Sequence, residues 1–283
     1  MSGPRLLVAE GNAPAGRKRI AASTGRTASE SYAAVLRRIA PDATVDICYP
    51  SDPDPALRAA LASYDGVAIT GSSLNLYLRE PESLRQVEFL RGVYECGLPV
   101  FGSCWGLQLA TVAAGGEVRA NPRGREVAFA RKVTLTVAGQ VHPLHAGRPL
   151  AFDAPAIHAD EVSTLAPGTI VTAFNAASGV QAAEIRAGAS VVWAVQYHPE
   201  YSLGEVAATV RRYGRILVED GFFASLEELE AYAHDVATLE SDPARRDIAW
   251  RLDIGDDLLT AAGREREIVN WIETVVRGAR DKA

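Results

Sequence analysis

A cysteine flanked by glycines is the residue whose setting most clearly suggests chemistry. The segment Gly102-Ser103-Cys104-Trp105-Gly106 follows the apolar run Leu98–Phe101. This is the Gly-x-nucleophile-x-Gly spacing of a nucleophile elbow, where a strand turns sharply into a helix and exposes the nucleophile. Glycines leave room for such a turn, and the N–H groups at a helix N-terminus favour a thiolate. We therefore expect Cys104 to be a nucleophile, whereas Cys48 and Cys96 are expected to be ordinary free cysteines that act as small hydrophobes.

A cysteine nucleophile needs a base, and His198 is the best placed of the five histidines. It follows the apolar run Val191–Tyr197, and Pro199 and Glu200 come next. At the end of a parallel strand, His198 would share the carboxyl edge of the sheet with Cys104. Glu200 can accept the second imidazole N–H and fix the tautomer of the ring. The sequence therefore predicts a Cys104–His198–Glu200 triad, and such thiolate chemistry implies neither a metal nor another cofactor.

Other polar residues give less specific signals. Gly71-Ser72 follows the apolar run Gly66–Thr70 and could present backbone N–H groups to an oxyanion at the same sheet edge. His158-Ala159-Asp160 either lines a site or caps a turn, and the residues alone do not decide between these roles. His142 and His145 have a metal-like spacing, but no cysteine or carboxylate stands beside them and a proline interrupts them, so we expect a surface loop.

The elements that must position these residues alternate between short apolar strands and helices. This alternation predicts an α/β fold with a mostly parallel central sheet flanked by helices. The expected parallel strands are Leu6–Ala9, Thr44–Cys48, Gly66–Thr70 and Leu98–Phe101. The expected helices are Ala28–Ile39, Asp54–Ser63, Leu84–Glu95 and Leu107–Ala114. After Gly115-Gly116 we expect antiparallel strands without long helices between them, at Val133–Val137, Thr169–Phe174, Gln181–Ile185 and Val191–Tyr197.

The C-terminal part of the chain has the pattern of helices. A helix over Leu203–Asp220 would pack back on the sheet and complete a first domain, residues 1–220. An acidic helical extension, residues 221–283, follows, and Ser225 begins a capping box at its start. The last helix, from about Gly263 to Ala279, carries an apolar face that either the domain or another subunit of a homo-oligomer must cover. We expect this face to pack within the chain.

Length and composition are those of an ordinary folded protein. The chain has 283 residues, 48% of them hydrophobic and 23% charged, and a net charge of −6, which excludes a miniprotein and a disordered chain. No basic cluster with interleaved aromatic residues supports nucleic-acid binding. No apolar run approaches the roughly 18 residues of a membrane span. The first apolar run, Leu6–Ala9, is too short for a signal peptide, and the cysteines lack disulfide or zinc spacing, so we expect a cytoplasmic protein.

In these motifs the chain resembles the class I glutamine amidotransferases, in particular the glutaminase domain of GMP synthase. The matching segments, in chain order, are Gly71-Ser72, Gly102–Gln108, Gly115-Gly116, Gly124–Glu126, His158–Val162 and Tyr197–Glu200. The resemblance covers residues 5–218, and the elbow together with His-Pro-Glu is a specific combination. It implies the flavodoxin-like fold of that family, with the helical C-terminal extension outside the family pattern.

The resemblance implies a reaction at the side-chain amide of glutamine. Cys104 would attack the amide, His198 would pass a proton to the departing ammonia, and Glu200 would orient His198. A γ-glutamyl thioester would form, and water would then release glutamate. By the same comparison, the backbone N–H groups of Gly71 and Trp105 would form the oxyanion hole. The residues implied to hold the substrate are Ser72, Gln108, Glu126, Ala128 and Phe129.

Two features depart from the family pattern. Ala128 stands where many relatives have glycine, at the substrate end of the expected pocket. The stretch 12–27 is longer and more basic than expected after the first strand, and it could form a lid or the mouth of the pocket.

Three hypotheses of function follow. The leading one is a glutaminase that supplies ammonia to a separate synthetase in trans, because the ATP-pyrophosphatase signature Ser-Gly-Gly-x-Asp-Ser is absent from the sequence. The alternative is a γ-glutamyl hydrolase or peptidase, which uses the same thioester and differs only on the leaving-group side of the pocket. The third is a non-catalytic binding module of the same fold. The intact triad residues argue against this last hypothesis.

Overall fold

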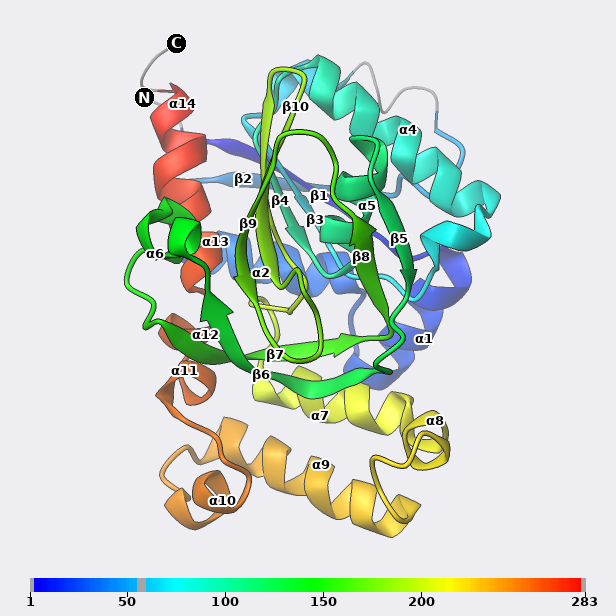
Figure 1. Ribbon diagram of the computed structural model, residues 1–283, viewed down its shortest axis with the longest axis vertical. Coiled ribbons are helices and arrows are strands. Elements are labelled where there is room, and N and C mark those ends of the chain that lie inside the picture. The colour runs from blue at the N-terminus through cyan, green and yellow to red at the C-terminus, as the bar shows by residue number, and fades with distance from the viewer. Residues whose placement is uncertain (1–2, 55–59, 281–283) are drawn as a thin grey trace.

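The computed structural model describes residues 3–54 and 60–280, and its centre is a nine-stranded sheet (Figure 1). The strand order is β2-β1-β3-β4-β11-β10-β9-β6-β7. The parallel strands are β1 (Arg5–Ala9), β2 (Thr44–Cys48), β3 (Gly66–Ile69), β4 (Val100–Ser103) and β11 (Ser190–Val195). The antiparallel strands are β6 (Glu126–Leu135), β7 (Ala151–His158), β9 (Thr169–Phe174) and β10 (Ala182–Ala187). The expected α/β fold, with a mostly parallel sheet extended by antiparallel strands, is confirmed.

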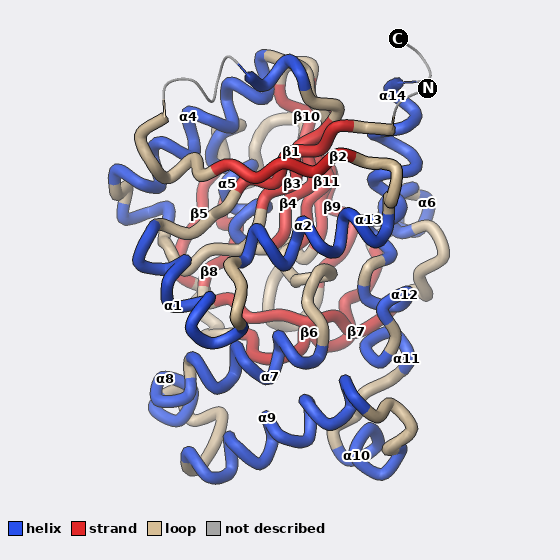
Figure 2. The backbone as a smooth tube through the Cα atoms, turned by 180° about the vertical axis from the view of Figure 1, so that it is seen from behind, coloured by secondary structure: helices blue, strands red, loops and turns tan. Residues whose placement is uncertain are grey.

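Alternate side chains of the parallel strands enter two separate cores. In β1, Leu6 and Val8 belong to one core and Leu7 and Ala9 to the other, because successive side chains of a strand point to opposite faces. On the first face, α2 (Ala28–Ile39) lies beside α13 (Arg266–Trp271), near the C-terminus (Figure 2). On the second face lie α4 (Pro81–Glu95) and α5 (Trp105–Ala113).

A third layer lies beneath the β6–β7 hairpin in the view of Figure 1. There α7 (Leu203–Arg212) packs on the hairpin, and α9 (Leu226–Ser241) packs on α7 to form a third apolar core. The short helices α8 (Gly214–Glu219) and α10 (Arg246–Arg251) flank α9. The expected single helix over residues 203–220 is therefore broken at Tyr213.

The last part of the chain returns to the main sheet. Its segments are α11 (Asp256–Leu259), α12 (Ala261–Arg264), α13 (Arg266–Trp271), a π-helical stretch (Ile272–Arg277) and α14 (Gly278–Arg280). Trp271 is fully buried, and its ring centroid lies 5.8 Å from that of Phe101. A Cβ at Gly66 would already lie 3.1 Å from the indole. The apolar face of the last helix therefore packs within the chain, as expected.

Several expected elements differ from the structure. Residues 55–59 of the expected helix Asp54–Ser63 lie outside the described residues, and Leu61–Ser63 form a short 3-10 helix. The expected strand Val133–Val137 is the end of the longer β6, and its last residue begins α6 (Val137–Val141). We did not expect β7, whose sequence contains Pro155, because proline is rare inside sheets. Nor did we expect the small separate sheet of β5 (Glu117–Ala120) and β8 (Asp160–Thr164).

The pair His142 and His145 does not form a surface loop, so that prediction was wrong. Nε2 of His142 lies 3.0 Å from the carboxylate of Glu184, and Nε2 of His145 lies 3.0 Å from the hydroxyl of Thr172. His145 is only 3% exposed. The short helices around these residues fold them onto the antiparallel strands. Within residues 3–54 and 60–280, no helix has both the length and the apolar character needed to cross a membrane.

Candidate active site

Cys104 lies on a strained turn between β4 and α5. Its backbone angles are φ 53° and ψ −98°, which non-glycine residues rarely adopt and which are most often found at functional sites. A Cβ at Gly102 would lie 2.6 Å from the carbonyl carbon of Gly106, and a Cβ at Gly106 would lie 3.0 Å from the carbonyl oxygen of Ile69. The N–H of Cys104 donates to the carbonyl of Val195 at 2.8 Å, which ties the turn to β11. The backbone turn expected of a nucleophile elbow is therefore present.

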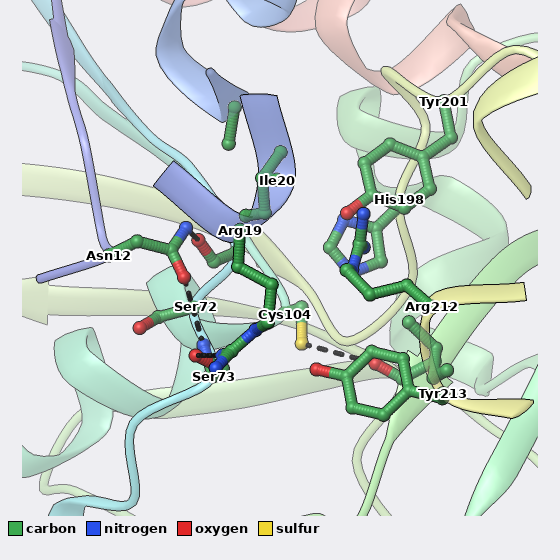
Figure 3. A pocket seen from close by; sticks show the side chains of 13 residues that line it. Asn12, Arg19, Ile20, Ser72, Ser73, Cys104, His198, Tyr201, Arg212 and Tyr213 are labelled. Atoms are coloured by element: carbon green, nitrogen blue, oxygen red, sulfur yellow. Dashed lines mark hydrogen bonds between the residues drawn. The ribbon is translucent and has the colours of Figure 1, made fainter. Parts of the chain in front are cut away.

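His198 is held in one orientation near Cys104 (Figure 3). Its Nδ1 lies 2.7 Å from Oε1 of Glu200, and its ring stacks on that of Tyr201 with the centroids 4.0 Å apart. A Cβ added at Gly71 would lie 2.5 Å from Cε1 of His198, so only glycine fits there. The histidine is 2% exposed. Glu200, Tyr201 and Gly71 together fix the imidazole, with Nδ1 bound to the carboxylate and Nε2 left for chemistry.

The charges around the imidazole favour its protonated form. Burial opposes a charge on His198, but the carboxylate of Glu200 and the sulfur of Cys104 outweigh burial and raise the pKa of His198 to about 10. The ring therefore keeps its second proton at neutral pH. An imidazolium beside a cysteine stabilises the thiolate, which is the reactive form of the side chain.

A backbone N–H group for an oxyanion is available at Trp105, next to Cys104. Trp105 is the first residue of α5, so its N–H has no carbonyl partner within the helix. Its indole N–H donates to Gln86 at 2.8 Å, which leaves only the backbone of Trp105 for a ligand. The carbonyl of Gly71 accepts from the side-chain amide of Asn12 at 3.1 Å, and this bond fixes the loop after β3. The two residues expected to form the oxyanion hole thus lie beside Cys104 and His198, respectively.

Cys104 opens on a cavity with two lobes. The larger lobe has a volume of about 370 Å³ and the smaller one, drawn in Figure 3, of about 30 Å³. His198 lines the smaller lobe and Gln108 the larger one. The residues that line both lobes are Arg19, Ser72, Ser73, Cys104, Ile157, Arg212 and Tyr213. The sulfur of Cys104 therefore stands where the two lobes meet.

The larger lobe carries charges of both signs. The carboxylate of Asp160 accepts from the side-chain amide of Asn75 at 2.7 Å and from the hydroxyl of Tyr77 at 3.2 Å, and burial raises the pKa of Asp160. Arg125 lines the same lobe, where it pairs with Asp220 at 3.2 Å. Among the described residues, no group of three or more His, Cys, Asp or Glu side chains is arranged to hold a metal ion.

Of the residues expected to hold the substrate, Ser72 and Gln108 line the cavity. Glu126, Ala128 and Phe129 do not, so the structure corrects these three expectations. Ala128 and Phe129 both belong to the third core, which they share with α7 and α9. At Ala128 the backbone is also in the left-handed region, with φ 62°.

Glu126 is buried among hydrogen-bond partners instead of facing the cavity. Its carboxylate lies 2.8 Å from Nε2 of His158 and accepts from the side-chain amides of Asn175 at 2.6 Å and Gln181 at 2.7 Å. Nδ1 of His158 lies 2.9 Å from the carbonyl of Asp160. The sequence left open whether His158 lines a site or fixes a turn. In the structure it has both roles, because it lines the larger lobe and holds the turn before β8.

Sequence reasoning missed part of the cavity wall. The stretch 12–27 contains a helix, α1 (Pro14–Thr24), whose residues Arg19 and Ile20 line the smaller lobe. The stretch therefore lines the cavity, which both expected roles require, although the helix itself was not expected. Arg212 and Tyr213 also line both lobes. The only sequence signal for this role was the position of the two residues in the helix expected after His198.

Comparisons with known proteins agree with this geometry. The family profile described as "Glutamine amidotransferase class-I" matches residues 27–212. A γ-glutamyl-L-1-hydroxyisopropylamide hydrolase from Pseudomonas sp. is 38% identical over 275 residues, which cover 96% of this chain and 93% of that protein. A glutamine-hydrolysing GMP synthase from Nitrosomonas eutropha is 29% identical over 174 residues, which cover 59% of this chain and 31% of that protein.

Solved structures share the fold. A glutamine amidotransferase from Thermotoga maritima superposes with a TM-score of 0.64 over 98% of this chain and 99% of that chain, at 14% identity. The structural likeness shows the common fold, and the family profile and the sequence relatives show the family. The chain therefore belongs to the class I glutamine amidotransferases, a family of amide-hydrolysing enzymes.

Proposed function

We propose that this enzyme hydrolyses γ-glutamyl amides through Cys104, His198 and Glu200. The Cys104 thiolate attacks the γ-carbonyl carbon and forms a C–S bond, while the N–H groups of Gly71 and Trp105 stabilise the oxyanion. The His198 imidazolium gives its proton to the leaving nitrogen as the C–N bond breaks. His198 then takes a proton from water, which attacks the thioester, and the C–S bond breaks to release glutamate.

The observation that carries this proposal is the extent of the similarity to the Pseudomonas hydrolase. That relative aligns with 96% of this chain and with 93% of its own length, so the alignment includes the C-terminal helices as well as the sheet. The GMP synthase relative matches over only 31% of its own length. A hydrolase that works without a synthetase domain is therefore the better-supported function.

The larger lobe supports a glutamyl group as the acyl part of the substrate. A γ-glutamyl amide carries an α-ammonium and an α-carboxylate at the end remote from the scissile bond. In this lobe, the carboxylate of Asp160 has the charge that complements the α-ammonium. The guanidinium groups of Arg125 and Arg212 have the charge that complements the α-carboxylate, and Gln108 supplies an amide that can hydrogen bond. A volume of about 370 Å³ lies within the range of small-ligand pockets.

The second candidate function is glutamine hydrolysis that supplies ammonia to a separate synthetase. The observation in its favour is the match of 59% of this chain to a glutamine-hydrolysing GMP synthase. The chemistry at Cys104 is identical, and the two functions differ in leaving group and in the need for a partner.

The test is glutamate release by the purified full chain from glutamine and from γ-glutamyl alkylamides in parallel. Cys104→Ala is the blank, and its melting temperature is compared with that of the unchanged protein to verify folding. Cys104-dependent hydrolysis of alkylamides well above that of glutamine supports the proposal. Slow turnover of glutamine alone that a synthetase stimulates would favour the second candidate. If none of the compounds is hydrolysed in a Cys104-dependent way, both candidate functions are refuted.

A further inference from the structure

We infer that the smaller lobe receives the leaving amine and admits only a short one, so that Ile20 on α1 determines which γ-glutamyl amides are cleaved. This inference rests on the proposed γ-glutamyl amide hydrolysis. His198 must protonate the leaving nitrogen, and His198 lines the smaller lobe, whereas Gln108 and Asp160 line the larger one. The leaving amine therefore projects to the His198 side of Cys104.

Part of the wall of the smaller lobe is apolar. Ile20 from α1 and Ala28 from the start of α2 line it. Tyr201, whose ring stacks on His198, lines it as well (Figure 3). An alkyl substituent on the leaving nitrogen that contacts these side chains would be removed from water. This part of the lobe thus offers an alkyl group a favourable environment next to the group that protonates the amine.

The lobe is too small for an amino acid. A water molecule needs about 10–15 Å³ of such volume, so a lobe of about 30 Å³ holds two or three water-sized groups. Beyond Ile20 the space continues between α1 and α7 as a second small cavity of about 20 Å³, which also borders Ala28 and Tyr201. A chain of a few carbon atoms fits this space, whereas the side chain and carboxylate of an amino acid leaving group do not.

The wall is held in place by polar contacts at both ends of α1. The side chain of Asn12 donates to Glu10 at 2.8 Å and accepts from the N–H of Ser73 at 3.1 Å. Arg17 pairs with Asp52 at 2.6 Å. At the other end, Arg212 donates to the hydroxyl of Ser23 at 2.9 Å and so joins the end of α7 to α1. Ile20 therefore projects from a fixed helix, and its size sets the size of the lobe.

Charges of both signs border this space. Arg19, Arg212 and the imidazolium of His198 line the smaller lobe, whereas Glu200 and Glu205 border the second small cavity. The charges therefore do not select against an ammonium group, and size alone sets the restriction. The favoured substrates are γ-glutamyl amides of ammonia and of short alkylamines.

The experiment compares kcat/KM for glutamine, γ-glutamyl propylamide and γ-glutamylvaline. For the unchanged protein we expect the propylamide to be cleaved at least tenfold faster than γ-glutamylvaline. Ile20→Ala should raise the ratio of γ-glutamylvaline to glutamine cleavage at least about tenfold, since a single methylene group in a pocket is worth about 10-fold or more. Ile20→Trp should lower the ratio of propylamide to glutamine cleavage by at least as much.

Ala22→Trp is the matched control, because it introduces the same side chain at an exposed position of α1. It should leave all ratios unchanged. Equal cleavage of γ-glutamylvaline and the propylamide, or ratios that do not respond to either Ile20 variant, would overturn this inference while leaving γ-glutamyl hydrolysis in place. The absence of Cys104-dependent turnover of every compound would overturn both.

Discussion

The hydroxyl of Tyr197 donates a hydrogen bond at 3.0 Å to the carboxylate of Glu267, which lies on α13 near the end of the chain. Tyr197 immediately precedes His198. On the other side of the triad segment, Glu240 of α9 accepts from the backbone N–H groups of Leu203 at 2.8 Å and Gly204 at 3.3 Å, in the first turn of α7. The C-terminal helices therefore hold the segment that carries His198 and Glu200 from both ends.

Tyr197→Phe tests whether this contact positions the base. The change keeps the ring and removes one hydrogen bond to a charged group, which costs about 1.5–3 kcal/mol of stability. Glu267 keeps its paired contacts with Arg148, both at 2.7 Å, so the fold is retained. We expect kcat/KM to fall about tenfold, because a displacement of His198 by a fraction of an ångström is amplified in the rate. Enzyme kinetics over a range of pH provide the measurement.

Tyr232→Phe is the control for this change, since it removes the same atom from α9, away from the triad. Its kcat/KM should match that of the unchanged protein. If Tyr197→Phe lowers the melting temperature but leaves kcat/KM and its pH dependence unchanged, Tyr197 has only a structural role.

The pH dependence should report the pKa of His198. Since Glu200 and Cys104 raise this pKa to about 10, kcat/KM should fall as the pH rises through about 10, where the proton for the leaving amine is lost. Glu200→Gln removes one of the charges that raise the pKa, so the alkaline limb should move to lower pH. The exposed Glu88→Gln is the control and should leave the limb in place. If the alkaline limb of Glu200→Gln lies at the same pH as that of the unchanged protein, Glu200 is not the group that raises the pKa of His198.

The same shift has a consequence for stability. Because the pKa of His198 in the folded protein lies above the value of about 6.5 in an unfolded chain, its protonation stabilises the fold fully below pH 6.5. This contribution is lost as the pH rises through about 10. The free energy of unfolding, measured in urea at several pH values, should therefore decline less on the alkaline side in Glu200→Gln than in the unchanged protein.

The triad could be predicted from sequence because its signals are local. Glycines on both sides of Cys104 specify the turn, and an apolar strand before His198 specifies the sheet edge. Ala128 and Phe129 are neighbours in β6 and yet belong to one core, and the left-handed backbone at Ala128 has no signal in the local sequence. Glu126 is held by His158, Asn175 and Gln181, which lie far along the chain. In α1 the few apolar residues are not gathered on one face, so the helix gave no periodic signal.

Gly71→Ala should impair catalysis more than folding. A Cβ at this position would lie 2.5 Å from the His198 ring, and the ring cannot retreat because it stacks on Tyr201 and is bound to Glu200. Overpacking of this kind costs about 1–3 kcal/mol, whereas a displacement of the imidazole by about 1 Å lowers kcat/KM by about 100-fold. Gly179→Ala is the control, since no atom lies within 4 Å of its Cβ position. Equal activity of the two variants would show that the space at Gly71 does not determine the position of the His198 ring.

We propose that residues 221–283 fold together with residues 1–220 as one unit, and Trp271→Ala tests this. Its fully buried indole packs against Phe101 of β4, so the change should cost about 3–5 kcal/mol. Trp250→Ala, which removes an indole that is 74% exposed, should cost little. In urea, loss of activity and loss of helical signal should coincide in a single transition that Trp271→Ala shifts as a whole. If there are two transitions, and Trp271→Ala does not change the urea concentration at which activity is lost, the extension is instead a separate domain.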